Sequence, residues 1–589
     1  MNKIEKLRQQ ILSQNPTEEQ RDAIFSDELE FLLRASPGSG KTWTSCRRFI
    51  WRGANWDYKV GGLALLSFTN VAIHEFYEAT IKVGCRELLS DPNYIGTFDS
   101  FVERFIITPF GHLITGSAKR PKLFTESHSA FLKGTSFSTL VEFNNGTRIP
   151  IPTSKLTPMI ENKKVVYGFQ TPNGKLTKVK VLSKTSPPMA LMKAGYISHE
   201  HRKFWAFYLL KKRPYLCQLL ARRFPEIIVD EAQDTNEWLI QCLKVLHDAG
   251  TKVTLVGDPD QCIYEFMLAH PESLEALKTD WKIPELPLSK SFRCNNPIAS
   301  SAANISGNDM FIGCSNARSE YENAFIVREP TKKCIHSISI FEKLLESAFI
   351  GNKDASILCR AHADIDSIRG KANYNTLQGN TKLFAHAAFL RDGRKDFKKA
   401  FNLIESCIRA LTAEDDIWVR IEENGGSEEA EKARLVIWRF LKSQEGLPSV
   451  SEISTEWIDN LKTNLISLFK SIGITNPPKL GHKIRKHGLS PTQQELPLFQ
   501  PQTPLPPTRL ATIHQVKGES IDGVLVLGSV KFFNAVVRAI ESDDNTEDRR
   551  LAYVAMTRAR HTLIIGLPAS HYDQYSSSWQ KWGFQILQN

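Results

Sequence analysis

Short apolar runs alternate with amphipathic stretches along most of this chain. Six runs have the composition of buried strands: GLALLSF near Leu63, PEIIVDE near Ile227, KVTLVGD near Val253, ASILCRA near Ile357, GVLVLGS near Val524 and HTLIIGL near Leu563. Runs of this kind, separated by helix-type segments, are typical of parallel sheets that are covered by helices. They fall into two groups, before and after about residue 281, which predicts two α/β domains.

Two segments fit neither sheet. Residues 106–200 are rich in turns, and NNGT and PNGK within them predict β-hairpins. Residues 386–507 are mostly helical and charged, and they end in the Pro/Gln-rich linker PTQQELPLFQPQTPLPP. The predicted organisation is a first domain (1–105 and 201–281) with an inserted subdomain (106–200), and a second domain (282–385 and 508–589) with a helical inserted subdomain and linker (386–507).

Composition narrows the class of protein. The 589 residues are enough for about four domains, and 41% apolar content supplies several cores. A formal charge of +11 favours a polyanionic partner. The ten cysteines show no CxxC or zinc-binding spacing, so free thiols are expected. The start MNKIEKLRQQIL is charged throughout and no run of about 18 apolar residues occurs, so we expect a soluble, cytoplasmic protein without a membrane partner.

The octet ASPGSGKT at residues 35–42 has the form of a phosphate-binding loop. It lies between EFLLRA, a strand-type run, and TWTSCRRFIW, which can continue as a helix. Glycines let backbone N–H groups surround a phosphate, the lysine neutralises its charge and the final hydroxyl holds Mg²⁺. A plain Gly/Ser surface turn is the alternative, and the flanking strand and helix argue against it. The candidate residues are Ser36, Pro37, Gly38, Ser39, Gly40, Lys41 and Thr42.

The segment VDEAQD at residues 229–234 supplies the carboxylates that such a loop needs. An apolar strand ends here in two adjacent acids, so Asp230 can anchor Mg²⁺ and Glu231 can polarise an attacking water. An isolated acidic strand end is often only solvated, but here it shares the chain with a phosphate-binding loop. The pair predicts an enzyme that splits a nucleoside triphosphate with the help of Mg²⁺.

Further motifs follow in a fixed order along nearly the whole chain. They are NPTEEQRDAI, LSFTNVAIHEF, IGTFDSF, LVGDPDQCIYEF, LSKSFRC, TIHQVKGES and EDRRLAYVAMTRARHTLIIG. With the two segments above, this series resembles the superfamily 1 DNA helicases of the Rep, UvrD and PcrA type. The resemblance implies two RecA-like domains, each with an inserted subdomain, and ATP-driven movement on DNA, 3′ to 5′ as in the wider family.

The resemblance also implies roles for individual residues. Around ATP it implies Gln20 and Phe292 on adenine, Gln261 as the sensor of the γ-phosphate, Arg293 and Arg558 on that phosphate, and Glu519 near the ribose. Arginines supplied by a second domain suit phosphoryl transfer, because its charge spreads over several oxygens. On single-stranded DNA it implies Phe68, Thr69, Asn70, Thr97, Phe98, Phe266 and His514. Aromatic rings stack on any base, but Phe266 is as readily a core residue, and a single histidine such as His514 is often structural.

Several positions depart from the family pattern. Asp99 replaces the usual histidine, and Met267 stands where the family has an arginine that touches DNA. Trp43 follows the phosphate-binding loop where an adenine-stacking arginine often lies, so adenine is expected between Trp43 and Phe292 with loose base selectivity. Glu519 comes one position earlier than expected, and Ser520 occupies the usual place.

The block IGTFDSFVERFIITPFG and the motif VGDPDQCIYEF resemble the helicase-like subunit of the Gabija antiphage system. That resemblance implies a partner of the OLD family, with ATPase and TOPRIM nuclease domains. Three hypotheses therefore stand: a helicase-like subunit that senses DNA ends or single strands and activates a nuclease, a free-standing repair helicase, and a nucleotide-gated binding module. The missing arginine at Met267 argues against the second, and the complete set of catalytic side chains argues against the third.

Overall fold

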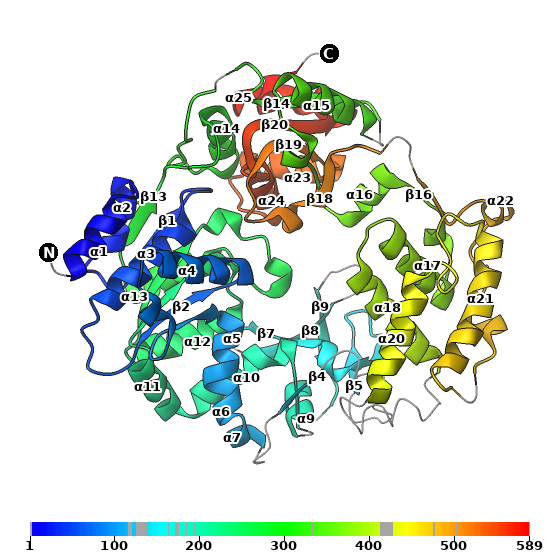
Figure 1. Ribbon diagram of the computed structural model, residues 1–589, viewed down its shortest axis with the longest axis horizontal. Helices are drawn as coiled ribbons and strands as arrows, with labels where there is room; N and C mark the ends of the chain where they lie inside the picture. Colours follow the sequence, from blue (N-terminus) through cyan, green and yellow to red (C-terminus); the bar gives the residue numbers. More distant parts are fainter. Residues whose placement is uncertain are drawn as a thin grey trace. The chain divides into compact units, whose positions relative to one another are not determined.

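The chain divides into two compact units, which are described separately (Figure 1). The first comprises residues 1–123, 139–361 and 507–589, and the second comprises residues 124–138 and 362–506. The structure, a computed structural model, describes residues 3–115, 121–124, 138–162, 164–170, 176–183, 185–193, 195–317, 319–331, 334–412, 428–474, 477–501 and 505–587.

The first unit contains a six-stranded parallel sheet in the order β13-β1-β12-β11-β2-β3. Its strands are β1 (Leu32–Ala35), β2 (Leu63–Ser67), β3 (Tyr94–Thr97), β11 (Glu226–Val229), β12 (Lys252–Gly257) and β13 (Glu285–Leu288). Strand β13 pairs with β1, so the predicted domain boundary at residue 281 falls before the last strand of this sheet.

Both faces of this sheet are buried because its strands are apolar at successive positions. Along β11, Ile228 faces one core and Ile227 and Val229 face the other. One face is covered by α1 (Lys3–Leu12), α2 (Glu18–Phe25), α3 (Lys41–Ala54) and α4 (Asn70–Lys82). The other is covered by α5 (Phe98–Val102), α10 (His199–Lys212), α11 (Pro214–Arg223), α12 (Glu237–Asp248) and α13 (Glu272–Trp281). Unbroken apolar strands are what a sheet with two covered faces requires.

A second six-stranded parallel sheet has the order β18-β15-β19-β20-β14-β21. Its strands are β14 (Ala324–Glu329), β15 (Ala355–Cys359), β18 (Arg509–Thr512), β19 (Ile521–Leu527), β20 (Ala559–Pro568) and β21 (Gln585–Ile586). It is accompanied by α14 (Asn296–Ser306), α15 (Ile335–Ser347), α23 (Val530–Glu541), α24 (Glu547–Met556) and α25 (Ala569–Lys581). All six predicted strand segments are strands, and the prediction of two RecA-like α/β domains is confirmed.

A five-stranded sheet, in the order β6-β5-β9-β8-β7, is inserted into the first domain. Its strands are β5 (Ser138–Glu142), β6 (Arg148–Pro152), β7 (Leu156–Glu161), β8 (Lys164–Gln170) and β9 (Leu176–Val181). The predicted NNGT turn joins β5 to β6, and Gly146 in it has φ +80°, where glycine is favoured. The predicted PNGK turn lies outside the described residues.

The second unit is mainly helical, as its charged sequence indicates. It contains α16 (His362–Arg369), α17 (Gly379–Asp392), α18 (Phe397–Leu411), α20 (Glu428–Lys442), α21 (Ser454–Ser471) and α22 (Pro491–Gln494). Helices α17, α18, α20 and α21 share one apolar core. A short antiparallel pair joins β16 (Gly370–Ala372) to β17 (Phe499–Pro501). Helix α22 and strand β17 lie within the segment predicted as a linker, and a capping box at Ser490 begins the helix.

The composition predicts free thiols and no membrane-spanning segment. All ten cysteines are free thiols. Within the described ranges, no helix is both long and apolar enough to cross a membrane.

A buried ion pair joins α3 to the amino end of β11. Arg52 Nε and one terminal nitrogen donate to the two carboxylate oxygens of Glu226 at 3.0 and 2.5 Å. Removing Glu226 leaves the buried Arg52 with only a longer, 3.4 Å contact to the exposed Asp57, so Glu226→Ala should destabilise the first domain by about 3 kcal/mol. The exposed pair of Lys3 and Glu87 offers a control, and Glu87→Ala should change little. Urea unfolding followed by tryptophan fluorescence measures both, and equal midpoints for the two variants would contradict the prediction.

Candidate functional site

The phosphate-binding loop follows β1 as the sequence predicts, and its glycines are required by close neighbours. Gly38 and Gly40 have φ of +72° and +81°. A Cβ on Gly38 would lie 2.6 Å from the Cβ of Arg293, and one on Gly40 would lie 2.8 Å from Gln20 Nε2. Phe292 N donates to Gly38 O at 2.8 Å, and Ser291 Oγ donates to Pro37 O at 2.8 Å. The loop is therefore held by the segment that leads into the second domain.

The loop runs directly into α3, whose first residue is Lys41. Gly40 occupies the N-cap position, and no side chain caps this helix end. Backbone N–H groups at such an end, with the helix dipole behind them, form an anion-binding site. Lys41 is 8% exposed, and its Nζ lies 4.0 Å from Glu231 Oε2. The arrangement suits a phosphate chain in both geometry and charge.

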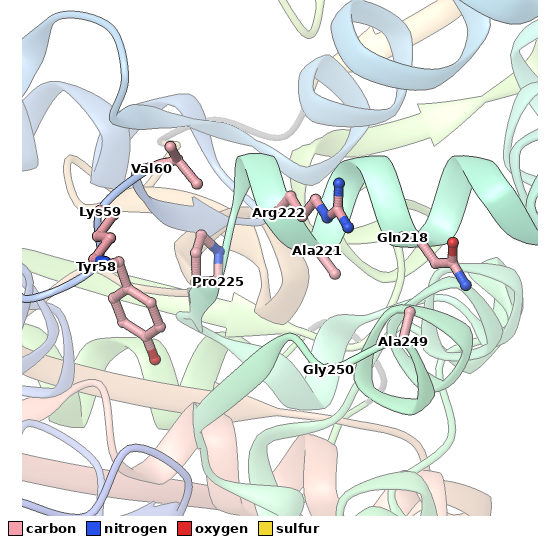
Figure 2. Close-up of a pocket in the computed structure, with 9 residues that line it drawn as sticks. All are labelled: Tyr58, Lys59, Val60, Gln218, Ala221, Arg222, Pro225, Ala249 and Gly250. Carbon is pink, nitrogen blue, oxygen red and sulfur yellow. The ribbon is translucent and has the colours of Figure 1, made fainter.

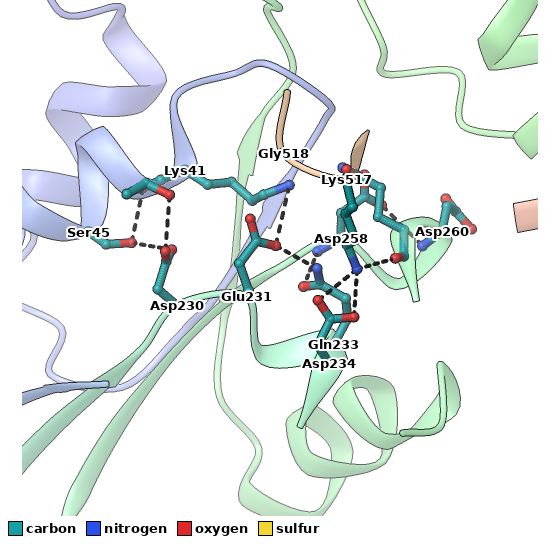
Figure 3. Close-up of polar contacts among 12 residues, drawn as sticks. Lys41, Ser45, Asp230, Glu231, Gln233, Asp234, Asp258, Asp260, Lys517 and Gly518 are labelled. Carbon is teal, nitrogen blue, oxygen red and sulfur yellow. Dashed lines mark hydrogen bonds and ion pairs between the residues drawn. The ribbon is translucent and has the colours of Figure 1, made fainter. Parts of the chain in front are cut away.

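Asp230 accepts hydrogen bonds from two hydroxyls of α3. Thr42 Oγ1 and Ser45 Oγ each lie 3.0 Å from one of its carboxylate oxygens. Figure 3 shows the contact of Ser45 with Asp230. Burial, and then the charge of Glu231, raise the pKa of Asp230 above its usual range. A hydroxyl beside one carboxylate fits Mg²⁺, which binds through few protein oxygens together with substrate phosphates. Within the described residues, no group of three or more His, Cys, Asp and Glu side chains is placed to hold a metal ion.

Glu231 occupies a strained backbone position at the end of β11. Its φ is +53°, and Gln233 Nε2 donates to its Oε2 at 2.6 Å. Burial acts to raise the pKa of Glu231, but Lys41 and Lys517 outweigh it, so the pKa lies below its usual value. A carboxylate that stays ionised beside a phosphate site can orient and polarise a water. Left-handed strain at a non-glycine residue is typical of functional positions.

The first and second domains meet at Gln261. Its Nε2 donates to Asp258 Oδ2 at 2.6 Å, and its Oε1 accepts from a terminal nitrogen of Arg558 at 3.1 Å. Arg558 is 1% exposed, and burial followed by the charge of Arg293 lowers its pKa to about 9. The γ-phosphate sensor and the arginine expected from the resemblance are therefore in direct contact.

Lys517 makes a second connection between the domains, and the sequence analysis missed it. Its Nζ donates to Asp234 at 2.7 and 2.6 Å and to Gln261 O at 2.8 Å (Figure 3). It also lies 4.6 Å from the centre of the Tyr264 ring. Burial raises the pKa of Asp234 to about 6 against the opposing charge of Lys517. Asp234 lies in VDEAQD and Lys517 lies in TIHQVKGES, so both residues stand in recognised motifs. Only the fold shows that they pair with each other.

Arg293 contacts the second domain rather than the carboxylates. Its Nε donates to Ser520 Oγ at 2.7 Å, and one terminal nitrogen donates to Thr557 O at 3.1 Å. Burial lowers the pKa of Arg293, and its charge also lowers that of Arg558. The two guanidinium groups repel each other beside the phosphate-binding loop, so an anion that binds between them would relieve this repulsion.

The residues expected around adenine and the ribose differ in their exposure and in whether they already have partners. Gln20 is 4% exposed: its Oε1 accepts from Thr17 N and its Nε2 donates to Ser39 O, both at 3.0 Å. Phe292 is 51% exposed, whereas Trp43 is half-buried beneath the guanidinium of Arg47 at 4.3 Å. Glu519, expected near the ribose, is paired with Arg509 at 2.6 Å.

The candidate DNA-binding residues also differ among themselves. Phe68 stacks on Tyr264 with ring centres 5.6 Å apart, and His514 lies 6.0 Å from the same ring. His514 Nε2 also lies 3.1 Å from Ile263 O, and burial lowers the pKa of its imidazole. Tyr264 therefore links motifs of both domains, and it was missed because a single tyrosine in a motif gives no positional signal.

Two polar members of this set, Thr69 and Thr97, are the N-caps of α4 and α5. Asn70, the first residue of α4, is exposed. Phe98 is 5% exposed and packs in the core beneath the first sheet, so its ring is not presented to solvent. The side chain of Phe266 lies outside the described part of the chain.

Asp99 and Met267, the two main departures from the family pattern, each contact neighbouring residues of the first domain. Asp99 lies 3.6 Å from Arg202 and 3.7 Å from Lys203, so its charge is balanced by α10. Met267 is 38% exposed, and its carbonyl accepts from Asn236 Nδ2 at 2.6 Å.

A separate cavity of about 500 Å³ lies at the opposite edge of the first sheet (Figure 2). It is lined by Tyr58, Lys59, Val60, Gln218, Ala221, Arg222, Pro225, Ala249 and Gly250. Val60, Pro225 and Gly250 precede β2, β11 and β12, so the cavity is at the amino ends of these strands. Ligand sites of parallel α/β sheets lie at the carboxyl ends, which identifies the phosphate-loop edge as the candidate catalytic site.

Comparison with known proteins agrees with this geometry. Residues 16–282 match the UvrD/REP helicase N-terminal domain, and residues 416–569 match the UvrD-like helicase C-terminal domain. DNA helicase II of Haemophilus influenzae is 22% identical over 94% of this chain and 84% of its own length. The ATP-dependent DNA helicase Rep of Buchnera aphidicola subsp. Schizaphis graminum is 24% identical over 93% of this chain and 92% of its own. The helicase srs2 of Schizosaccharomyces pombe is 24% identical over 50% of this chain and 34% of its own.

The Lys517 bridge generates a prediction. Lys517→Met removes all three of its hydrogen bonds and leaves Asp234 buried without a cation, so Gln261 loses its support. We expect the ATP hydrolysis rate to fall at least about tenfold with nucleotide affinity little changed. Steady-state hydrolysis and a fluorescent-nucleotide titration measure the two quantities. Lys531→Met, on the exposed face of α23, is the matched control, and equal rates for the two variants would contradict the role of the bridge.

Proposed function

Because the chain belongs to the UvrD/Rep family of superfamily 1 helicases, we propose that it hydrolyses ATP to move along DNA. Members of this family are ATP-dependent DNA helicases, which are hydrolases, and this chain is one of them. The observation that supports the site assignment best is the contact of Arg558 with Gln261 at 3.1 Å. It brings a cation of the second domain to the catalytic edge of the first.

The nucleotide would bind with its phosphates on the loop and on the amino end of α3. Lys41 and the backbone N–H groups neutralise and orient the phosphate chain. Thr42 and Asp230 are the residues that would hold Mg²⁺, which when bound neutralises charge on the phosphates. Glu231 would orient the attacking water and accept its proton.

Charge that develops on the γ-phosphate would be met by Arg293 and Arg558. Both guanidinium groups come from residues after the first sheet, so binding and release of the phosphate change the contact between domains. Trp43 and Phe292 would stack on adenine. Gln20 already has partners at both ends of its amide, which supports loose selectivity for the base.

Single-stranded DNA would bind near the aromatic group of Phe68, Tyr264 and His514. Aromatic rings stack on any base, so binding does not depend on the DNA sequence, as a motor that moves along DNA requires. The contact of Lys517 with both Tyr264 and Gln261 supplies a short path from this group to the γ-phosphate sensor. Movement in the 3′ to 5′ direction, typical of the family, is part of the proposal.

The finer proposal is a role as the helicase-like subunit of an antiphage complex. Two departures from the family pattern support this role. Asp99 replaces the usual histidine and is balanced by Arg202 and Lys203. Met267 stands in place of a DNA-binding arginine. The partner would be an OLD-family ATPase with a TOPRIM nuclease domain, which the DNA-bound subunit would activate. A free-standing repair helicase fits the same catalytic site equally.

ATP hydrolysis by the purified chain, with and without a single-stranded oligonucleotide, tests the proposal. We expect hydrolysis above the level of Lys41→Ala, and a loss of at least about 100-fold in Glu231→Gln because the water loses its base. Glu272→Gln, on the exposed first turn of α13, is the matched control.

The effect of DNA and the unwinding of a duplex with a 3′ tail distinguish the two roles. Strong stimulation with unwinding supports a self-sufficient helicase, whereas a low rate that ignores DNA supports a subunit that needs its partner. A full rate in Glu231→Gln would contradict the catalytic assignment itself.

A further inference from the structure

Strand β7 is an edge strand of the inserted sheet, and side chains of the first domain bind its free backbone edge. Leu156, Pro158 and Ile160 are spaced two apart, so their backbone groups point to the same side. His201 Nε2 donates to Leu156 O at 2.8 Å, and Trp238 Nε1 donates to Pro158 O at 2.7 Å. Ile160 N donates to Glu237 Oε1 at 2.8 Å. The edge that would otherwise be open to another strand is thus fixed to α10 and α12.

These contacts are shielded from water. His201 and Trp238 are 0% and 2% exposed, and the side chain of Glu237 is 14% exposed. Burial lowers the pKa of His201 to about 4, so the ring is neutral and donates through Nε2. A buried hydrogen bond is costly to break when its partner is left unsatisfied.

Glu237 is the first residue of α12, and the same helix end holds the segment 267–270. Glu237 N donates to Leu268 O at 2.9 Å, and Asn236 forms an isolated bridge with Ala269. Glu237 Oε2 lies 4.0 Å from His270 Nε2. One residue therefore binds strand β7 with its side chain and the segment 267–270 with its backbone.

The position of this residue connects it to the catalytic edge. Helix α12 begins three residues after Asp234, and the segment 267–270 begins three residues after Tyr264. Burial of the Glu237 carboxyl costs free energy of folding, so packing alone does not explain this residue. Burial raises its pKa to about 7, and the hydrogen bond from the N–H of Ile160 opposes that shift. An apolar residue would pack there at lower cost, but it could not accept the hydrogen bond of Ile160.

We propose that Glu237 is a positioning residue for DNA-dependent ATP hydrolysis. It fixes the inserted β sheet and the segment 267–270 to each other, so that DNA bound near Tyr264 acts on a rigid framework. The inference rests on the proposed function for its readout, DNA stimulation, but the contact itself does not depend on that function.

Four variants test the role. Glu237→Ala removes the acceptor of Ile160 N, and Glu237→Gln keeps an acceptor oxygen. Trp238→Phe keeps an aromatic ring at the site, but it removes the N–H donor to Pro158 together with one ring of the buried indole. Asp248→Ala, at the exposed end of the same helix, is the matched control because its side chain is 78% exposed.

Hydrolysis is measured with and without a 20-nucleotide oligo-dT, over a range of ATP concentrations. We expect Glu237→Ala to lower the DNA-stimulated kcat about tenfold with KM for ATP and the basal rate unchanged, since the phosphate site is intact. Trp238→Phe should lower it in the same direction, and Glu237→Gln and Asp248→Ala should remain close to wild type. Hydrogen exchange of the Ile160 amide should become faster in Glu237→Ala and stay slow in Glu237→Gln.

The outcomes separate the inference from the proposed function. A wild-type rate that ignores DNA would overturn the self-sufficient motor and, with it, the DNA-dependent role of Glu237, whatever the exchange of Ile160 shows. A stimulated wild type with an equally stimulated Glu237→Ala, despite faster exchange at Ile160, would overturn the positioning role. Equal loss in Glu237→Gln and Glu237→Ala would also overturn it, because the hydrogen bond would not be the cause.

Discussion

The interaction on which this structure depends is the balance of charge at the carboxyl edge of the first sheet. Four acidic residues gather there: Asp230, Glu231, Asp234 and Asp258. Water is largely excluded from them, so their charges need cations or donors close by. The first domain supplies Lys41, and the second supplies Lys517 and Arg558. The catalytic edge of one domain is thus neutralised in part by the other.

In the proposed function, this dependence would let ATP act on both domains. A bound triphosphate would add negative charge beside Lys41, which lies 4.0 Å from Glu231, and beside Arg293 and Arg558, which contact neutral groups in this structure. Hydrolysis and release remove that charge again. Lys517 also contacts Tyr264, whose ring stacks on Phe68 in the motif that is proposed to bind DNA. The proposed nucleotide site and the proposed DNA site are therefore joined by one short set of contacts through Lys517.

Much of the fold could be predicted from the sequence. Apolar runs such as GLALLSF are strands because both faces of each sheet are covered, and the phosphate loop follows β1 because strand, turn and helix signals agree. The acidic pair at Asp230 and Glu231 lies beside Thr42 and Lys41, as phosphate chemistry requires. The strands and the loop are local features that residue patterns determine, whereas the loop and the acidic pair, 188 positions apart, are brought together in the sequence analysis only by the chemistry they share.

Contacts between distant segments could not be predicted in the same way. The pairing of Lys517 with Asp234 joins residues 283 positions apart, and no local pattern encodes it. Phe98 lies in a motif whose resemblance implies DNA contact, yet it is buried, because a helix start turns its ring into the core. Glu519 is paired with Arg509, a neighbour in the fold that the motif alone does not show. The turn at residues 172–175 and the side chain of Phe266 lie outside the described residues.

The central claim is that Gln261 and Arg558, from different domains, act as one unit in ATP hydrolysis. A double-mutant cycle tests it most directly, with single-turnover rates for Gln261→Ala, Arg558→Ala and the double variant. Arg560→Ala, two residues along the same segment and paired with Asp522 at the surface, is the control for a lost positive charge. The account predicts that the double variant is about as slow as Arg558→Ala alone, because either change breaks the same contact. Rate losses that multiply in the double variant would contradict it, since the two residues would then act independently.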